Sequence, residues 1–191
     1  MKAKQRVPAL CSAVLVNRQK RYGLRSASLV PFVRRLGRRL RLRKQEFNVC
    51  FVDDSAIRKL NSTYRGKNKA TDVLSFPWTE APGLRAADAL VISRHGEFED
   101  FTNFLGDVVI SVEAARRNAR KEGHSTLNEI RWLILHGLLH LIGYDHSRDT
   151  GEMVALELSL REQLGIAGRL VAQSNTPSVE SKPRKSHRLR I

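Results

Sequence analysis

The stretch STLNEIRWLILHGLLHLIG, residues 125–143, decides the fold predicted for this chain. Placed on a helix, its leucines and isoleucines fall on every side, a pattern typical of a helix buried in the middle of a domain. Thr126 with Glu129 three residues later predicts a capping box at its start. Gly143 predicts its end, because glycine readily takes the left-handed conformation that stops a helix. We therefore expect a central buried helix.

The segments around this helix predict several strands and further helices. Apolar alternation and apolar runs predict strands at 13–16, 47–52, 72–76 and 105–111. Caps and helical spacing also predict helices. One is capped by Ser28 and reaches Leu40, and another runs from Asp53 or Asp54 through Tyr64. Two more are predicted at 112–121 and at 151–164. Too few strands alternate with helices for a doubly wound sheet. The expected fold is α/β (α+β): a small mixed sheet of about four strands with helices packed on it.

The chain length of 191 residues suits one domain with tails. We expect a basic N-terminal tail at 1–12, a single domain at 13–168 and a disordered basic C-terminal tail at 169–191. Within the domain, residues 79–104 lose periodicity and predict a surface loop.

Charge is distributed unevenly along the chain. Lys and Arg number 34 against 19 Asp and Glu, a net charge of +15, and residues 1–44 hold 14 basic residues and no acid. Basic flanks favour a polyanionic partner, nucleic acid before membrane, because cations beside phosphates release condensed counterions. A solvated charge run that only aids solubility is the alternative. No apolar run approaches the roughly 20 residues of a membrane span.

Two cysteines, Cys11 and Cys50, lie in apolar runs and form no CxxC pair. We expect reduced core residues of a cytoplasmic protein.

Three histidines are concentrated in HGLLHLIGYDH, residues 136–146. His136 and His140 are four residues apart, so a helix places them on one face about one turn apart. A turn at Gly143 then brings His146 back toward that face. Three imidazoles with an open fourth position are typical of one catalytic zinc ion. The alternative is a set of core histidines bonded to backbone carbonyls.

A zinc ion in this position favours hydrolysis, since it activates water near neutral pH and polarises carbonyl or phosphoryl oxygens. The spacing H-x-x-x-H-x-x-G-x-x-H also fits metzincin-like metallopeptidases. Those enzymes carry a glutamate beside the first histidine as general base, where this chain has Gly137. The peptidase interpretation therefore lacks its base.

Arg65 begins a second candidate motif, with Lys67 and Lys69 in the same loop. A guanidinium offers paired donors to phosphate oxygens, which favours phosphate binding by these three residues, with Arg65 as the candidate catalytic cation. An ordinary solvated basic loop is the alternative. Asp107 and Asp145 are candidates to orient the imidazoles, with capping or a surface role as the alternative.

Taken together, HGLLHLIGYDH, NSTYRGKNKATDVLSFP at 61–77 and LGDVVIS at 105–111 strongly resemble the YbeY family of bacterial endoribonucleases. The resemblance covers about residues 14–164. It implies a single-strand-specific, zinc-dependent endoribonuclease in the maturation of the 16S rRNA 3′ end and in ribosome quality control. It also implies that His136, His140 and His146 hold zinc and that Arg65 is functionally important.

The partners implied by the resemblance are precursor 16S rRNA and the small ribosomal subunit, with ribosomal proteins or an assembly GTPase as further candidates and no membrane. A non-catalytic ribosome-assembly protein with a structural metal remains an alternative, as does the metallopeptidase.

Overall fold

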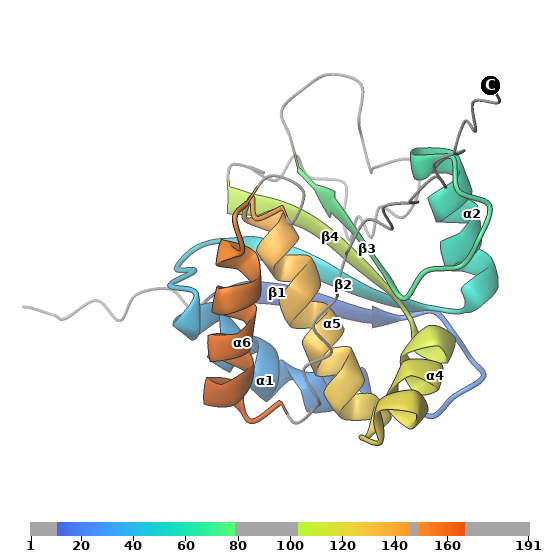
Figure 1. Cartoon of the computed structure of the whole chain (residues 1–191), viewed down its shortest axis with the longest axis horizontal. Coiled ribbons are helices and arrows are strands. Elements are labelled where there is room, and N and C mark those ends of the chain that lie inside the picture. The colour runs from blue at the N-terminus through green and yellow to red at the C-terminus, as the bar shows by residue number, and fades with distance from the viewer. Residues whose placement is uncertain (1–10, 79–102, 146–148, 167–191) are drawn as a thin grey trace, which may run out of the picture.

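The computed structural model describes residues 11–78, 103–145 and 149–166 (Figure 1). Their four strands form one sheet in the order β1-β2-β4-β3. The bounds are β1 Ser12–Asn17, β2 Glu46–Val52, β3 Val73–Pro77 and β4 Phe104–Ser111. Strand β2 runs parallel to both β1 and β4, whereas β3 is antiparallel to β4. The expected mixed sheet of four strands is confirmed.

Helices pack on both faces of the sheet. Their bounds are α1 Val30–Arg39, α2 Asp54–Arg65, α4 Val112–Glu122, α5 Thr126–Leu141 and α6 Glu152–Leu164. Because side chains alternate along a strand, β2 turns Phe47, Val49 and Phe51 toward the larger core with α1, α5 and α6. Cys50 and Val52 belong to a smaller core with α2. Figure 1 shows α5 between α6 and α4, with α2 above α4 and away from α6.

The predicted central helix is α5. Its residues Ile130, Leu133, Ile134, Leu138 and Leu139 are all buried, which confirms that this helix lies inside the domain. No helix in the described part of the chain is long and apolar enough to cross a membrane.

The predicted capping box at the start of α5 is wrong by one residue. Ser125 caps the helix, and its hydroxyl accepts a hydrogen bond from the backbone N–H of Asn128. Glu129 does not reach back to the cap, because its side chain is fully buried beside His124, whose Nε2 lies 3.1 Å from Glu129 Oε2. The side chain of Glu129 therefore belongs to the interior of the domain and not to the helix cap.

The predicted cap of the first helix is also wrong. A short 3-10 turn, Ser26–Leu29, precedes α1, so Ser28 lies inside that turn and its hydroxyl donates to the carbonyl of Arg25. Pro31 stands in the first turn of α1 instead, where a missing N–H costs no helical hydrogen bond.

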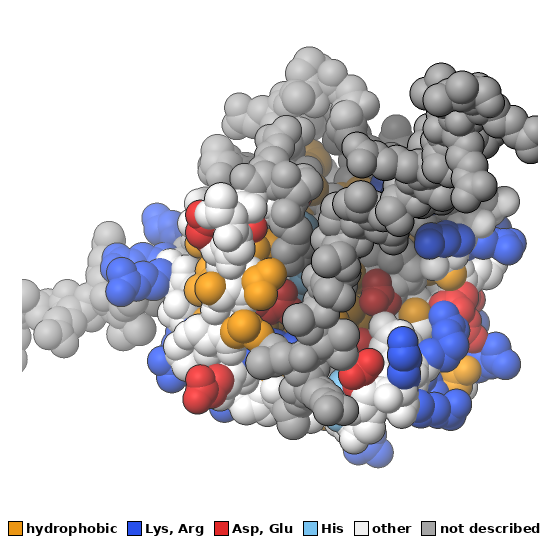
Figure 2. Space-filling view, in the orientation of Figure 1, with side chains coloured by type: hydrophobic (Ala, Val, Ile, Leu, Met, Phe, Trp, Pro, Cys, Tyr) orange, Lys and Arg blue, Asp and Glu red, His pale blue; other side chains and the backbone are white. Residues whose placement is uncertain are grey.

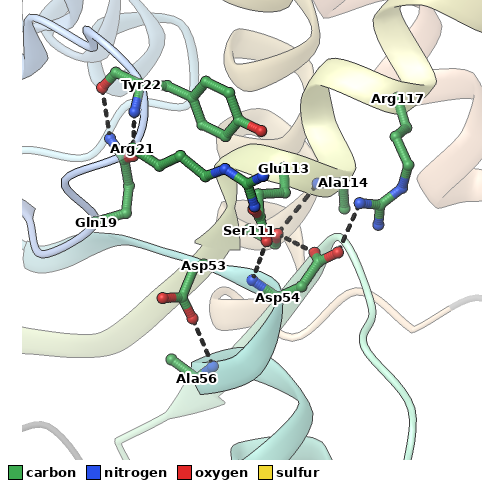
Figure 3. A network of polar contacts seen from close by, with 10 residues as sticks. All are labelled: Gln19, Arg21, Tyr22, Asp53, Asp54, Ala56, Ser111, Glu113, Ala114 and Arg117. Atoms are coloured by element: carbon green, nitrogen blue, oxygen red, sulfur yellow. Dashed lines mark hydrogen bonds and ion pairs between the residues drawn. The ribbon is translucent and has the colours of Figure 1, made fainter.

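An ion-pair network joins the N-termini of α2 and α4 (Figure 3). Asp54 accepts hydrogen bonds from Ser111 Oγ at 2.5 Å and from Arg117 Nη1 at 2.6 Å. Glu113 accepts the backbone N–H of Asp54 at 3.0 Å and pairs with Arg21 at 2.6 Å. Carboxylates at helix N-termini are favoured by the helix dipole. This network fixes the start of α2, whose other end carries Arg65.

Several predicted features lie outside the described residues. They are tail residues 1–10, nearly all of the predicted loop at 79–104, His146 and residues 167–191, which include the predicted C-terminal tail.

Candidate active site

Two of the three predicted metal ligands face each other on α5. His136 and His140 stand one turn apart, and their Nε2 atoms lie 3.2 Å from one another. The ring planes are nearly perpendicular, at 77°, with centroids 4.8 Å apart. The four-residue spacing thus brings two imidazole nitrogens together, as predicted.

Each imidazole also has an acceptor at its other nitrogen. His136 Nδ1 lies 3.2 Å from Glu157 Oε2 on α6. His140 Nδ1 lies 2.9 Å from the carbonyl oxygen of Tyr144. Glu157 is itself buried, and it accepts a second hydrogen bond from Trp132 Nε1. When Nδ1–H donates to these oxygens, the lone pair of each ring is on Nε2, so the two lone pairs point at a common region.

The donor set suits a metal cation. With both Nδ1 atoms protonated, two Nε2 lone pairs at 3.2 Å repel one another unless a proton or a metal cation lies between them. Two nitrogens bound to one tetrahedral zinc at the usual bond length stand about 3.3 Å apart, close to the observed separation. Metal-bound histidines also usually donate their second N–H to a carboxylate or carbonyl, as His136 and His140 are placed to do. The two described residues therefore fit the predicted group.

The chain turns sharply after the second histidine. Helix α5 ends at Leu141, and Gly143 has a φ of +100°, a conformation that glycine adopts without strain. The N–H groups of Gly143 and Tyr144 donate to the carbonyls of His140 and Leu139. The predicted stop at Gly143 is confirmed. His146 lies outside the described residues, whose His, Cys, Asp and Glu side chains form no group of three suited to a metal ion.

A pocket of about 660 Å³ opens beside His140. Three parts of the fold contribute to its wall: the end of α2 with β3, the turn after α5, and the start of α6. The lining residues are Arg65, Ser75, Pro77, His140, Gly143, Tyr144, Asp145, Asp149, Thr150 and Glu152. The structure thus brings the predicted Arg65 and His140, 75 positions apart in the sequence, to one pocket.

Charge in this pocket is mainly negative among the described lining residues. Asp145, Asp149 and Glu152 face a single arginine, Arg65. Asp149 accepts the backbone N–H groups of Gly151 and Met153 and so holds the start of α6. A phosphate entering this pocket would meet more negative than positive charge. A bound divalent metal cation would offset that excess of negative charge.

Gly137 packs against the sheet. A Cβ at this position would lie 2.5 Å from Val108 Cγ1 and 3.1 Å from Ser75 Oγ. The hydroxyl of Ser75 donates to the carbonyl of Gly137 at 3.1 Å. A glutamate here would collide with β4 instead of facing the pocket, so the general base of the metallopeptidase interpretation has no place on this backbone.

The other predicted polar residues are less closely associated with the pocket. Lys67 and Lys69 are exposed and do not belong to the described residues that line it. Asp107 accepts a hydrogen bond from Asn48 at 2.8 Å. Burial raises the pKa of Asp107, and the hydrogen bond from Asn48 opposes that rise. The carboxylate that the structure places beside His136 is Glu157, which the sequence does not single out. Its sequence signal was an acid on the buried stripe of α6 formed by Met153, Leu160 and Leu164.

The comparisons with known proteins agree with this geometry. The family model described as Endoribonuclease YbeY matches residues 17–165. The chain belongs to the YbeY endoribonuclease family. A YbeY endoribonuclease of Nautilia profundicola is 40% identical over 133 residues, which cover 70% of this chain and 82% of the relative. A YbeY endoribonuclease of Koribacter versatilis is 37% identical over 172 residues, which cover 90% of this chain and 99% of the relative.

A solved structure shows the same fold. The solution structure of TM1509 from Thermotoga maritima is similar with a TM-score of 0.52 and 23% identity, covering 80% of this chain and 88% of that one. Membership of the YbeY family makes this chain an endoribonuclease, a hydrolase of phosphodiester bonds in RNA. The expected enzyme class is confirmed over the metallopeptidase and the non-catalytic alternative.

Proposed function

We propose that this chain is a zinc-dependent endoribonuclease that cuts single-stranded RNA, and that it matures the 3′ end of 16S rRNA and serves ribosome quality control. The observation that carries the metal is the pair of Nε2 atoms 3.2 Å apart at the edge of a pocket that also holds Arg65. The YbeY likeness supports the ribosomal substrate.

His136, His140 and His146 are the proposed ligands of one zinc ion. Zinc in such a set supplies an activated water at neutral pH and a Lewis acid for a phosphoryl oxygen. Glu157 holds the His136 ring through Nδ1, and the Tyr144 carbonyl holds the His140 ring in the same way. Both contacts keep the Nε2 lone pairs directed at the ion.

Arg65 is the proposed catalytic cation of the protein. Arg65 lines the pocket, and the paired N–H donors of its guanidinium bind the non-bridging oxygens of the scissile phosphate and stabilise the charge that develops on them. Lys67 and Lys69 follow in the same exposed loop, and we assign them to neighbouring phosphates of the RNA chain.

The proposed substrate class rests on the composition of the chain. Aromatic residues make up 6% of the chain, so few rings are present on which bases stack. Contacts to phosphates of a single strand therefore supply most of the binding, and sequence choice comes from partners. The proposed partners are the small ribosomal subunit, its proteins and an assembly GTPase.

The proposed setting is the cytoplasm, where cysteines stay reduced. Cys11 and Cys50 are free and buried, and burial raises the pKa of the Cys11 thiol to about 11. Such thiols are largely protonated at neutral pH and serve packing. The proposed single domain spans 13–168, with basic tails on both sides.

A cleavage assay on precursor 16S rRNA that includes the unprocessed 3′ end tests the function. Wild type, Arg65→Ala and His140→Ala are purified in parallel, so contaminating nucleases act equally in all three preparations. The proposal predicts cuts near the mature 3′ end by wild type alone. Equal cleavage by the three proteins, or cuts unrelated to the 3′ end, would contradict it.

A further inference from the structure

One helix of the fold carries a dense positive surface that the active site does not use. On α1 and the turn that follows it, six cationic side chains are exposed within eleven positions: Arg34, Arg38, Arg39, Arg41, Arg43 and Lys44. We call these six residues the α1 basic surface. In the described part of the chain none of them forms an ion pair with a carboxylate, and no acidic residue precedes Glu46 in the sequence.

The opposite side of α1 explains why these cations cluster. Phe32, Val33 and Leu36 are buried against the sheet, so helical periodicity turns the intervening arginines to solvent. Arg35 differs from its neighbours, because its guanidinium donates to the carbonyl of Leu164 at 2.6 Å and fastens α1 to the end of α6. The fold thus uses one arginine of this helix for packing and leaves the six cations of the α1 basic surface to solvent.

Arg41 occupies a position that suits glycine. It follows the C-cap of α1 with a φ of +55°, and no other described residue except glycine has a positive φ. Helices commonly place glycine here, because a side chain is strained in the left-handed region. A cation at this place costs helix stability. That cost is consistent with a binding role for the side chain.

Two residues of the α1 basic surface, Arg43 and Lys44, lie at the end of the sheet on which the pocket lies. Pro77, which lines the pocket, pairs with Gly106 of β4, and Gly106 pairs with Phe47 near the start of β2. Arg43 and Lys44 stand two to three residues before the start of β2, so they lie at that same end. With one strand between β2 and β3, the two strands are about 10 Å apart. On the face of the molecule that Figure 2 shows, Lys and Arg side chains lie at the left and right sides, with acidic and apolar groups between them.

We propose that the α1 basic surface binds the phosphate backbone of the RNA substrate outside the pocket, so that the strand is held while the pocket cuts it. This inference rests on the proposed function and extends the substrate contact beyond the active site. RNA is favoured over a membrane surface for two reasons. The family acts on RNA. The apolar face of α1 is also buried in the described part of the domain, so this helix has no apolar stripe to enter a bilayer.

The test compares two double variants that remove equal charge. Arg39→Gln/Arg43→Gln alters the α1 basic surface, whereas Arg120→Gln/Lys121→Gln removes two exposed cations from α4. Affinity is measured by fluorescence anisotropy with labelled oligodeoxythymidine, which has the same phosphates and no 2′-OH, at several salt concentrations. The slope of log affinity against log salt should become shallower by about 1.4 in the first variant, or about 0.7 per lost phosphate contact. The α4 variant should keep the wild-type slope.

Equal slopes in wild type and the Arg39/Arg43 variant would overturn the proposal, as would equal effects of the two variants. Loss of binding to phosphatidylglycerol vesicles with unchanged oligonucleotide binding would also overturn it and assign the surface to membranes. Failure of the proposed function is a separate result: His140→Ala would then cleave RNA as wild type does, whatever the salt slopes show.

Arg41→Gly separates binding from folding. Glycine suits the observed φ, so the thermal midpoint should not fall below that of wild type, while oligonucleotide affinity should decrease severalfold. Unchanged affinity in this variant would count against a binding role for Arg41 and contradict the proposal.

Discussion

The Nε2 atoms of His136 and His140 lie 3.2 Å apart, and the Nδ1 atom of each ring is close to a fixed oxygen acceptor. Contacts from α6 and from the turn after α5 thus set the direction of both rings. The arrangement depends on the packing of α5 against α6, since Glu157 is contributed by the second helix. Substitutions in that packing should therefore affect metal binding.

Glu157→Gln should weaken zinc binding by about 10- to 100-fold, because the amide provides a poorer acceptor for His136 Nδ1–H and leaves the ligand less basic. Competition with a chromophoric chelator measures the affinity. Glu162→Gln, at an exposed position of the same helix, is the matched control and should bind zinc as wild type does. Equal affinities of the two variants would show that Glu157 does not position the ligand.

Gly137→Ala should destabilise the fold by about 1–3 kcal/mol, the usual range for overpacking, because its Cβ would lie 2.5 Å from Val108 Cγ1. Denaturant unfolding measures the change. Adding Val108→Ala should recover part of the loss, so the double variant should be more stable than the sum of the single effects predicts. Gly23→Ala, with open space around its Cβ, is the control. Strict additivity would contradict the proposed contact.

Arg65→Ala should reduce the single-turnover cleavage rate by about 100-fold, as expected for loss of a donor that stabilises transition-state charge. Arg65→Lys should recover little of it, because an ammonium lacks the planar pair of donors. Arg58→Ala, an exposed arginine on the same helix, should cleave normally. Full activity of Arg65→Lys would indicate that only charge is needed.

Glu129 makes stability depend on pH. Burial raises its pKa above the ordinary 4.5, against the opposing effects of Asn118 and His124, so the folded state holds this proton more tightly than the unfolded state does. Its contribution to stability is therefore complete below the unfolded pKa and is lost as pH rises through the folded pKa.

The Glu129→Gln variant has no proton to lose at this position, so it should not lose stability in this way as pH rises. Its thermal midpoint relative to wild type should rise from pH 4 toward neutral pH. Glu162→Gln, which removes an exposed carboxylate, should show no such trend. A constant difference between Glu129→Gln and wild type across this range would show that the buried carboxyl does not titrate differently in the folded state.

Local patterns predicted much of this fold, because hydrophobic periodicity and stop signals act over a few residues. The predicted strand at 47–52 begins one residue after β2 does, and Gly143 ends the central helix as expected. The capping-box motif selects Thr126, because Glu129 follows it by three residues. Ser125 caps α5 in the structure, and Glu129 packs beside His124 instead of reaching back to the cap.

The histidine spacing likewise predicted the approach of His136 and His140, which is local to one helix. Glu157 was missed because its contact with His136 depends on how α6 packs against α5, a long-range relationship. The sequence offers Asp107 as a candidate to orient an imidazole, and the sheet register adds a contact that local patterns do not reveal, the hydrogen bond from Asn48 of the neighbouring strand.

The most direct test of the central claim is zinc titration of chelator-treated protein, followed by RNA cleavage on the same samples. Wild type should bind one zinc ion and regain cleavage in proportion to the zinc bound. His136→Ala and His140→Ala should stay folded and lose both properties, whereas His124→Ala, whose ring pairs with Glu129, should retain them. Cleavage by metal-free wild type, or by either ligand variant at the wild-type rate, would contradict the account.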